Sequence, residues 1–223
     1  YDDWCAWLFG GVSTDSLMDQ LQTACDDPDC CGVMLFIDSP GGDAAAIHDL
    51  ADMIYQMRDT KPVVAYVDNL AASAAYWVAT AANQIVISPA AFLGSIGVVT
   101  TIWKDDSGRT VEIVSSKSPN KRPDIGTDEG RSVIQSRIDD LADVFIGAVA
   151  KHRDVEAATV ESDFGQGGVL IGAKAVAAGM ADMVGDSNDA FDALRELAER
   201  STSDQNRYGR FGPNTGKGNT MAE

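Results

Sequence analysis

Two short segments of the chain could together carry out acyl chemistry. The first is Asp38–Gly42, where a Gly-Gly turn leaves backbone amides that can face a ligand. The second is Ala71–Tyr76, which places Ser73 where a tight turn enters a helix rich in small residues. A serine nucleophile and paired amides that hold an oxyanion are the parts that acyl transfer needs most. The order and spacing of the two segments therefore predict half of an active site.

A serine nucleophile needs a base, and the chain offers two kinds. Its two histidines, His48 and His152, lie on predicted helices in positions more typical of surface residues than of catalytic ones. Lysine can replace histidine when its amine is kept neutral by burial or by cationic neighbours. The loop 115–124 contains Lys117 and Lys121. The ordinary role of a loop lysine is a solvated charge, so the residues alone leave the base open.

Predicted strands and helices alternate along the chain and would position these residues. The continuous apolar runs at 33–37 and 63–67 are typical of strands buried on both faces. Alternation of this kind predicts an α/β domain with right-handed crossovers. Further strands are expected at 85–87 and at 111–114, which follows a hairpin turn at 105–108; the segment Gly94–Val99 is expected to lead into another strand. Helices are expected at 44–58, 72–82, 127–152, 155–162, 173–179 and 188–199.

Length and charge limit the function classes. The chain has 223 residues and a net charge of −17, which argues against binding nucleic acid or an anionic membrane surface. No apolar run is long enough to span a bilayer. The first residues are acidic, without a signal peptide and without Met, so the chain is expected to begin inside a longer protein. Residues 1–199 are predicted to form one domain, and the polar residues 200–223 a disordered tail or linker.

The four cysteines do not predict a metal site. Cys5, Cys25, Cys30 and Cys31 crowd the first part of the chain, without a second matching pair or a histidine cluster. Reduced thiols in a cytoplasmic protein are expected, and neither a metal nor a cofactor is expected.

Several motifs, in order, resemble the signal peptide peptidase A family of serine proteases, which includes the capsid-maturation proteases of tailed phages. The resemblance covers about residues 10–195, and the phage type is the better match. The matching segments are Asp38–Gly42, Ala72–Trp77, Ala81–Val86, Gly94–Val98 and Ile171–Asp182. The resemblance implies a serine endopeptidase with Ser73 as the nucleophile and a lysine as the base.

The resemblance also suggests which lysine acts. In the family, the lysine follows the serine nucleophile along the chain and lies in a segment of the type Ser-Gly-x-x-Lys-Asp. In this chain Ser115-Ser116 stands where that segment has Ser-Gly, and an apparent insertion displaces the lysine. Lys121, shortly before Asp124, is the expected base, and Lys117 is the alternative. Ser95, in the Gly-Ser-Ile-Gly motif, matches the family position that orients the lysine.

The remaining implications concern the oxyanion hole and the fold. The oxyanion donors would be the amides of Gly42 and Ala74, with Gly41 shaping the turn. The fold would be similar to that of Clp proteases and crotonases, with repeated ββα units and a C-terminal helical segment. A Clp-type histidine would be expected near Val98, so a Ser-His-Asp site is disfavoured.

By the same resemblance the protein acts on proteins or peptides as a homo-oligomer, and adjacent protomers can complete the dyad. Capsid, portal or scaffold proteins are the expected partners, in the bacterial cytoplasm or the procapsid. Three alternatives stay open: a signal-peptide-degrading peptidase of the same family, a crotonase-type acyl-CoA hydratase or isomerase, and an inactive homologue that serves as an assembly scaffold.

Overall fold

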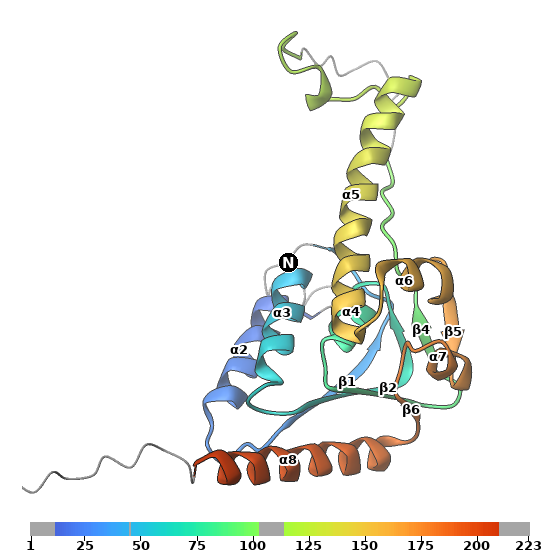
Figure 1. Ribbon diagram of the computed structural model, residues 1–223. Helices are drawn as coiled ribbons and strands as arrows, with labels where there is room; N and C mark the ends of the chain where they lie inside the picture. Colours follow the sequence, from blue (N-terminus) through green and yellow to red (C-terminus); the bar gives the residue numbers. More distant parts are fainter. Residues whose placement is uncertain (1–11, 45, 103–113, 210–223) are drawn as a thin grey trace, which may run out of the picture.

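The computed structural model describes residues 12–44, 46–102 and 114–209, and it shows a mixed α/β arrangement (Figure 1). The strands form one six-stranded sheet in the order β5-β4-β2-β3-β6, with β1 also paired to β2. The pairs are parallel except for β4 with β5. In chain order the elements are α2 (Thr14–Asp26), β1 (Val33–Ser39), α3 (Ile47–Met57), β2 (Val63–Ala72), α4 (Ala74–Thr80), β3 (Gln84–Ile87), β4 (Phe92–Gly94), η1 (Pro119–Lys121), α5 (Asp128–Arg153), α6 (Ala157–Asp163), β5 (Val169–Ile171), α7 (Ala173–Ala177), β6 (Met183–Val184) and α8 (Ser187–Gly209).

β2 is the central strand and changes neighbours along its length. Its first half pairs with β1 on one side and with β3 on the other, whereas residues 70–72 pair with β4. Side chains of a strand alternate between faces, and both faces of β2 are covered. Val63, Ala65 and Val67 enter the main core with α3 and α4, while Val64 and Tyr66 pack under α8. The expectation that residues 63–67 are buried on both faces is confirmed.

The same expectation for β1 was wrong. The side chains of 33–37 are half-buried, and Phe36 is 66% exposed. Within the described residues β1 pairs only with β2, so it lies at an edge of the sheet. Phe36 contacts the ring of Tyr66 edge-on, at 5.9 Å between ring centroids. An apolar run does not reveal whether its strand lies at the centre or at the edge of a sheet.

Several other predicted strands and helices differ from the structure in their residue bounds. Residues 98–102 form no strand, and the predicted hairpin at 105–108, with most of 111–114, lies outside the described residues. The short strands β4, β5 and β6 were not predicted, because two or three residues are too few to show a period. Helix α8 continues to Gly209, beyond the expected end at residue 199. The division of the chain at residue 200 stays a prediction.

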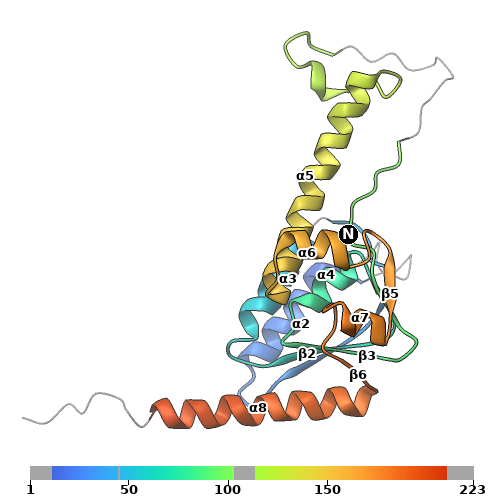
Figure 2. The ribbon, with the colours of Figure 1, turned by 45° about the vertical axis from the view of Figure 1, so that its right-hand side comes forward.

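α5 projects from the body of the molecule, as Figures 1 and 2 show from two directions. The hydroxyl oxygen of Thr127 accepts a hydrogen bond from the amide of Gly130 at 3.0 Å and so caps the helix. The C-terminal half packs on the body through Phe145, whose ring stacks on that of Trp77 at 4.6 Å, and through Val149. Towards the other end, Leu141 and Val144 are 37% and 48% exposed.

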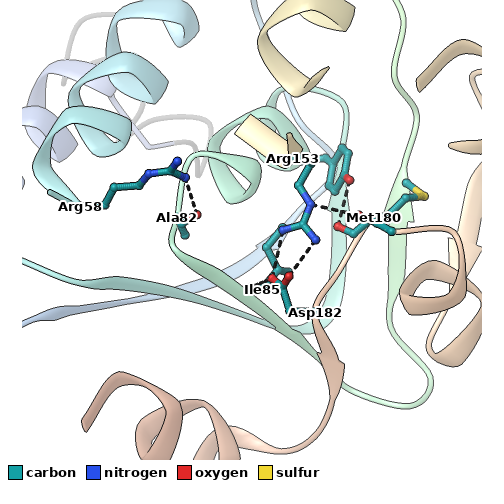
Figure 3. Close-up of polar contacts among 8 residues, drawn as sticks. Arg58, Ala82, Ile85, Arg153, Met180 and Asp182 are labelled. Carbon is teal, nitrogen blue, oxygen red and sulfur yellow. Dashed lines mark hydrogen bonds and ion pairs between the residues drawn. The ribbon is translucent and has the colours of Figure 1, made fainter. Parts of the chain in front are cut away.

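Arg153 fixes the C-terminal end of α5 to the edge of the sheet (Figure 3). Its guanidinium group makes two hydrogen bonds to the Asp182 carboxylate, at 2.9 and 3.0 Å, and Nε donates to the carbonyl oxygen of Gly179 at 3.0 Å. Asp182 also accepts from the amide of Ile85 in β3 at 2.6 Å. A bidentate, largely buried pair of this kind fixes geometry as well as charge.

His152, next to Arg153, lies in the core between α3, α4 and α5. Its ring stacks on Tyr55 at 4.7 Å, and Nδ1 lies 3.0 Å from the hydroxyl oxygen of Thr80. Because that hydroxyl donates to the carbonyl oxygen of Trp77 at 2.7 Å, its oxygen accepts from His152, and Nδ1 carries the proton. Nε2 is then an unprotonated, buried nitrogen with no partner within the described residues. Burial, with Lys151 and Arg58 nearby, lowers the pKa of His152 to about 4.

This shift predicts a pH-dependent contribution to stability. In the unfolded chain His152 binds a proton below its ordinary pKa of about 6.5, whereas in the folded protein it stays neutral down to about pH 4. The free energy of unfolding should therefore fall as the pH decreases between these values. Urea denaturation of wild type and His152→Gln measures the effect, because the carboxylates titrate alike in both. The stability advantage of wild type should be constant above about pH 7 and shrink towards pH 4; an advantage that stays constant across this range contradicts the assignment.

Candidate active site

Ser73 occupies the joint between β2 and α4. Its backbone has φ 52° and ψ −126°, a conformation that non-glycine residues rarely adopt. The joint is held from both sides: the Ser73 amide donates to the carbonyl oxygen of Gly94 at 2.8 Å, and the Ser73 carbonyl oxygen accepts from Trp77 at 3.0 Å. Such conformations cost on the order of 1–3 kcal/mol and persist only where the surroundings over-determine them, often at active sites.

The Gly-Gly turn packs directly against this joint. β1 and β2 run parallel with Ser39 opposite Ala71, so the chain reaches Gly41 beside Ser73. Gly41 has φ +96°, and a Cβ atom there would lie 2.7 Å from the carbonyl oxygen of Ala72, 2.8 Å from Ser73 Cβ and 3.0 Å from the Ala74 nitrogen. The structure therefore brings together the two segments that the sequence singled out.

The amides next to this contact are available to a ligand. A Cβ atom on Gly42 would meet nothing within 4 Å, so the turn is open at this residue. Among the described residues no acceptor is found for the amide of Gly42 or for that of Ala74, the first residue of α4. The first amides of a helix lack partners within it. Two unpaired amides flanking Ser73 are what an oxyanion hole requires.

Ser95 repeats the placement of Ser73 on the neighbouring strand. Gly94 pairs with Ala72, so each serine follows the end of its strand at the same edge of the sheet. Ser95 also has a positive φ, 54°, and its amide donates to the carbonyl oxygen of Gly168 at 2.7 Å. The backbone of Ser95 thus follows the residue that bonds the Ser73 amide, and its side chain is half-buried.

The turn that receives this hydrogen bond was missed from the sequence. Gly165, Gln166 and Gly167 have φ of 86°, 50° and 83°, and a Cβ atom on Gly94 would lie 2.5 Å from the carbonyl oxygen of Gly168. Three consecutive left-handed residues hold β5 tightly against the end of β4. The available signal was the Gly-Gln-Gly-Gly sequence itself, which is typical of backbone that must adopt positive φ.

The candidate lysines lie far from Ser73 within one chain. Lys121 ends η1, in the segment that folds over the projecting end of α5 (Figure 1). The guanidinium group of Arg137 donates to the carbonyl oxygen of Asn120 at 2.7 Å, so this turn lies beside the projecting, N-terminal half of the helix. α5 rises about 12 Å between Arg137 and Phe145, the residue that reaches α4. Lys117 belongs to the same segment, and both lysines are exposed.

Neither histidine replaces the lysine. His48 is exposed and lies between Asp49 and Asp52, at 3.7 and 3.8 Å. His152 is bonded to Thr80 in the core. In the part of the chain that the structure describes, the Ser73 hydroxyl makes no hydrogen bond. Among the described residues of one chain, the arrangement is therefore a candidate nucleophile and two amides, with neither candidate lysine and neither histidine placed as its base.

Two features are absent from the described residues. No group of three or more His, Cys, Asp and Glu side chains lies close enough together to hold a metal ion. None of the helices has the length and apolar character that are needed to span a bilayer.

A serine on a strained strand-to-helix joint, with free amides beside it, defines the kind of site that acyl-transferring hydrolases use. Comparison with known proteins agrees with this class: the profile described as Peptidase family S49 matches residues 55–105 and 112–201. The chain belongs to this family.

Individual relatives include phage and cellular proteins. The chain is 30% identical over 202 residues to capsid assembly protease C of Escherichia phage lambda, covering 87% of this chain and 46% of that protein. It is 32% identical over 198 residues to Protease 4 of Salmonella typhi, covering 85% of this chain and 32% of that protein. It is 27% identical over 196 residues to a putative signal peptide peptidase SppA of Enterococcus faecium, covering 81% of this chain and 55% of that protein. The chain thus spans less than two thirds of the length of these relatives.

The contact between Gly41 and the Ser73 joint predicts contrasting effects of two alanine substitutions. Gly41→Ala places a Cβ atom against backbone at a positive φ, so it should lower the free energy of unfolding by about 1–3 kcal/mol. Gly42→Ala, the matched control, meets open space and should change it by less than about 0.5 kcal/mol. Urea denaturation measures both, and equal stability of the two variants would contradict the packing described.

Proposed function

We propose that the protein is a serine endopeptidase in which Ser73 is the nucleophile, Lys121 the general base and Ser95 the residue that orients the lysine. One observation carries the proposal: Ser73 sits in a strained joint packed against Gly41, between two amides that have no other partner among the described residues. Membership of a peptidase family supports peptide hydrolysis over the acyl-CoA chemistry of crotonases.

In the proposed mechanism the neutral amine of Lys121 removes the proton from the Ser73 hydroxyl group as Oγ attacks the scissile carbonyl carbon. The amides of Gly42 and Ala74 hold the negative oxygen of the tetrahedral intermediate. The lysine then gives its proton to the departing amine, which leaves an acyl-enzyme. Attack of a water molecule, with the lysine again as base, releases the second product and restores Ser73.

The separation of Lys121 from Ser73 within one chain favours a site that two copies of the chain share. We propose that the projecting half of α5 docks on a neighbouring protomer and delivers Lys121 to that protomer's Ser73. Two features support this: η1 lies beside the projecting half of α5 in both views of the ribbon, and Leu141 and Val144 expose apolar surface near the middle of the helix. Isolated helices are marginal in water, so the projecting half gains stability from a partner.

We also infer the repeated ββα architecture, on the evidence of a second joint like that of Ser73. Gly172 connects β5 to α7 with φ 47° and ψ −120°, close to the values at Ser73 between β2 and α4. Both joints are followed by a short helix that starts with alanine. The same strand–joint–helix unit thus occurs twice, once with serine and once with glycine.

For the biological role we propose the processing of capsid or scaffold proteins during phage head assembly. The match over most of this chain to a relative named capsid assembly protease supports this role. Degradation of signal peptides is the alternative, since relatives named Protease 4 and SppA match at similar identity. Incubation with the scaffold and major capsid proteins encoded nearby tests the choice: site-specific cleavage supports head maturation, and cleavage of signal peptides alone supports the alternative.

The assignment of roles predicts the activity of three variants. Ser73→Ala and Lys121→Ala should each lower the cleavage of a denatured protein substrate by at least about 100-fold, because each removes a group that the chemical step needs. Lys117→Ala, in the same exposed segment, is the matched control and should retain activity. Initial rates are compared for samples of equal oligomeric state.

Two outcomes would change the assignment. Loss of activity in Lys117→Ala, with full activity in Lys121→Ala, would move the base to Lys117. Retained activity in Ser73→Ala would contradict the proposed function as a whole.

A further inference from the structure

The hydroxyl group of Tyr76 makes a buried hydrogen bond one helical turn from the candidate nucleophile. Tyr76 lies in the first turn of α4 and is fully buried. Its hydroxyl group donates to the carbonyl oxygen of Met180 at 3.0 Å. Burial raises the pKa of Tyr76, so the group stays a neutral donor. This contact joins the start of α4 to the loop between α7 and β6.

The accepting carbonyl group is itself held in place. Arg153 binds both ends of the short segment that contains Met180, through the Gly179 carbonyl oxygen and the Asp182 carboxylate (Figure 3). The Met180 amide donates to the carbonyl oxygen of Ala175 at 2.9 Å. A continuous set of hydrogen bonds therefore runs from the end of α5, through Met180, to the ring of Tyr76.

The joint at Ser73 needs such an anchor. α4 has seven residues and is too short to be stable by itself. The rare backbone conformation of Ser73 persists only if the elements on both sides of it are fixed. The Gly94 carbonyl oxygen fixes the side of β2, and Tyr76 lies where the side of α4 must be fixed.

We propose that Tyr76 is a positioning residue for Ser73, acting through the Met180 carbonyl group, which lies in the segment that Arg153 binds at Gly179 and Asp182. This inference rests on the proposed role of Ser73 as the nucleophile. It assigns Tyr76 no contact with substrate: its hydroxyl group sets the orientation of the first turn of α4, and with it the direction of the Ser73 hydroxyl group.

Tyr76→Phe tests the proposal because it removes only the hydroxyl group. We expect kcat to fall by about tenfold or more with little change in KM, since small displacements of reacting groups are costly. The rate at which a fluorophosphonate probe labels Ser73 should fall by a similar factor. Thr80→Val is the matched control: it removes another buried hydroxyl group of α4, which bonds the Trp77 carbonyl oxygen and His152, at the end of the helix away from Ser73. It should lower the melting temperature at least as much and leave kcat and labelling unchanged.

A second variant tests the route through the loop. Asp182→Asn weakens the pair with Arg153, and in the Tyr76→Phe background it should cause no further loss of kcat, because both changes act on the same contact. Additive losses would show that the pair does not act through Tyr76, and would overturn that part of the inference.

The remaining outcomes separate this inference from the function on which it rests. A Tyr76→Phe protein with the kcat and labelling rate of wild type would overturn it. So would equal losses of kcat in Tyr76→Phe and Thr80→Val, if each loss parallels the decrease in melting temperature. In either case, an inactive and unlabelled Ser73→Ala protein would leave the proposed nucleophile standing. Activity and labelling in Ser73→Ala would contradict both.

Discussion

The structure depends on one backbone constraint, the positive φ of Ser73 between β2 and α4. Three neighbours meet at this residue: Gly41 fills the space beside it, the Gly94 carbonyl oxygen binds its amide, and Trp77 binds its carbonyl oxygen. Because a Cβ atom at Gly41 would collide with backbone, this close packing of the Gly-Gly turn on Ser73 requires glycine at position 41. The conformation that is costly for folding is also the one that leaves the Ala74 amide unpaired beside the serine.

α5 connects this joint to the candidate base. Its C-terminal end packs on α4 through Phe145 and is fixed to the sheet by Arg153. Its other end holds the turn with Lys121, away from the body. Arg137 holds this turn about 12 Å along the helix axis from Phe145. In the proposed function, α5 therefore presents the lysine to a neighbouring molecule and not to the Ser73 of its own chain. In the proposed function the assembly controls activity, because among the described residues neither candidate lysine lies next to the Ser73 of its own chain.

The sequence predicted those features that local patterns encode. The strands at 33–37, 63–67 and 85–87, the long helix and the α/β class were all recognisable from apolar runs and helical spacing. The nearness of Gly41 to Ser73 could be expected because both follow parallel strands at the same edge of the sheet. The exposure of Phe36, the short strand β5 and the buried contact of Tyr76 with Met180 could not be predicted, since each depends on residues distant in sequence. The separation of Lys121 from Ser73 likewise appears only in three dimensions.

The central claim, that neighbouring chains share one active site, is tested most directly by mixing two inactive variants. Ser73→Ala and Lys121→Ala proteins are each purified, dissociated to monomers, combined in equal amounts and allowed to reassemble, and cleavage of a denatured protein is followed. The account predicts that the mixture regains activity, because an intact Ser73 on one chain meets an intact Lys121 on another. A mixture that forms mixed oligomers and stays inactive would contradict it.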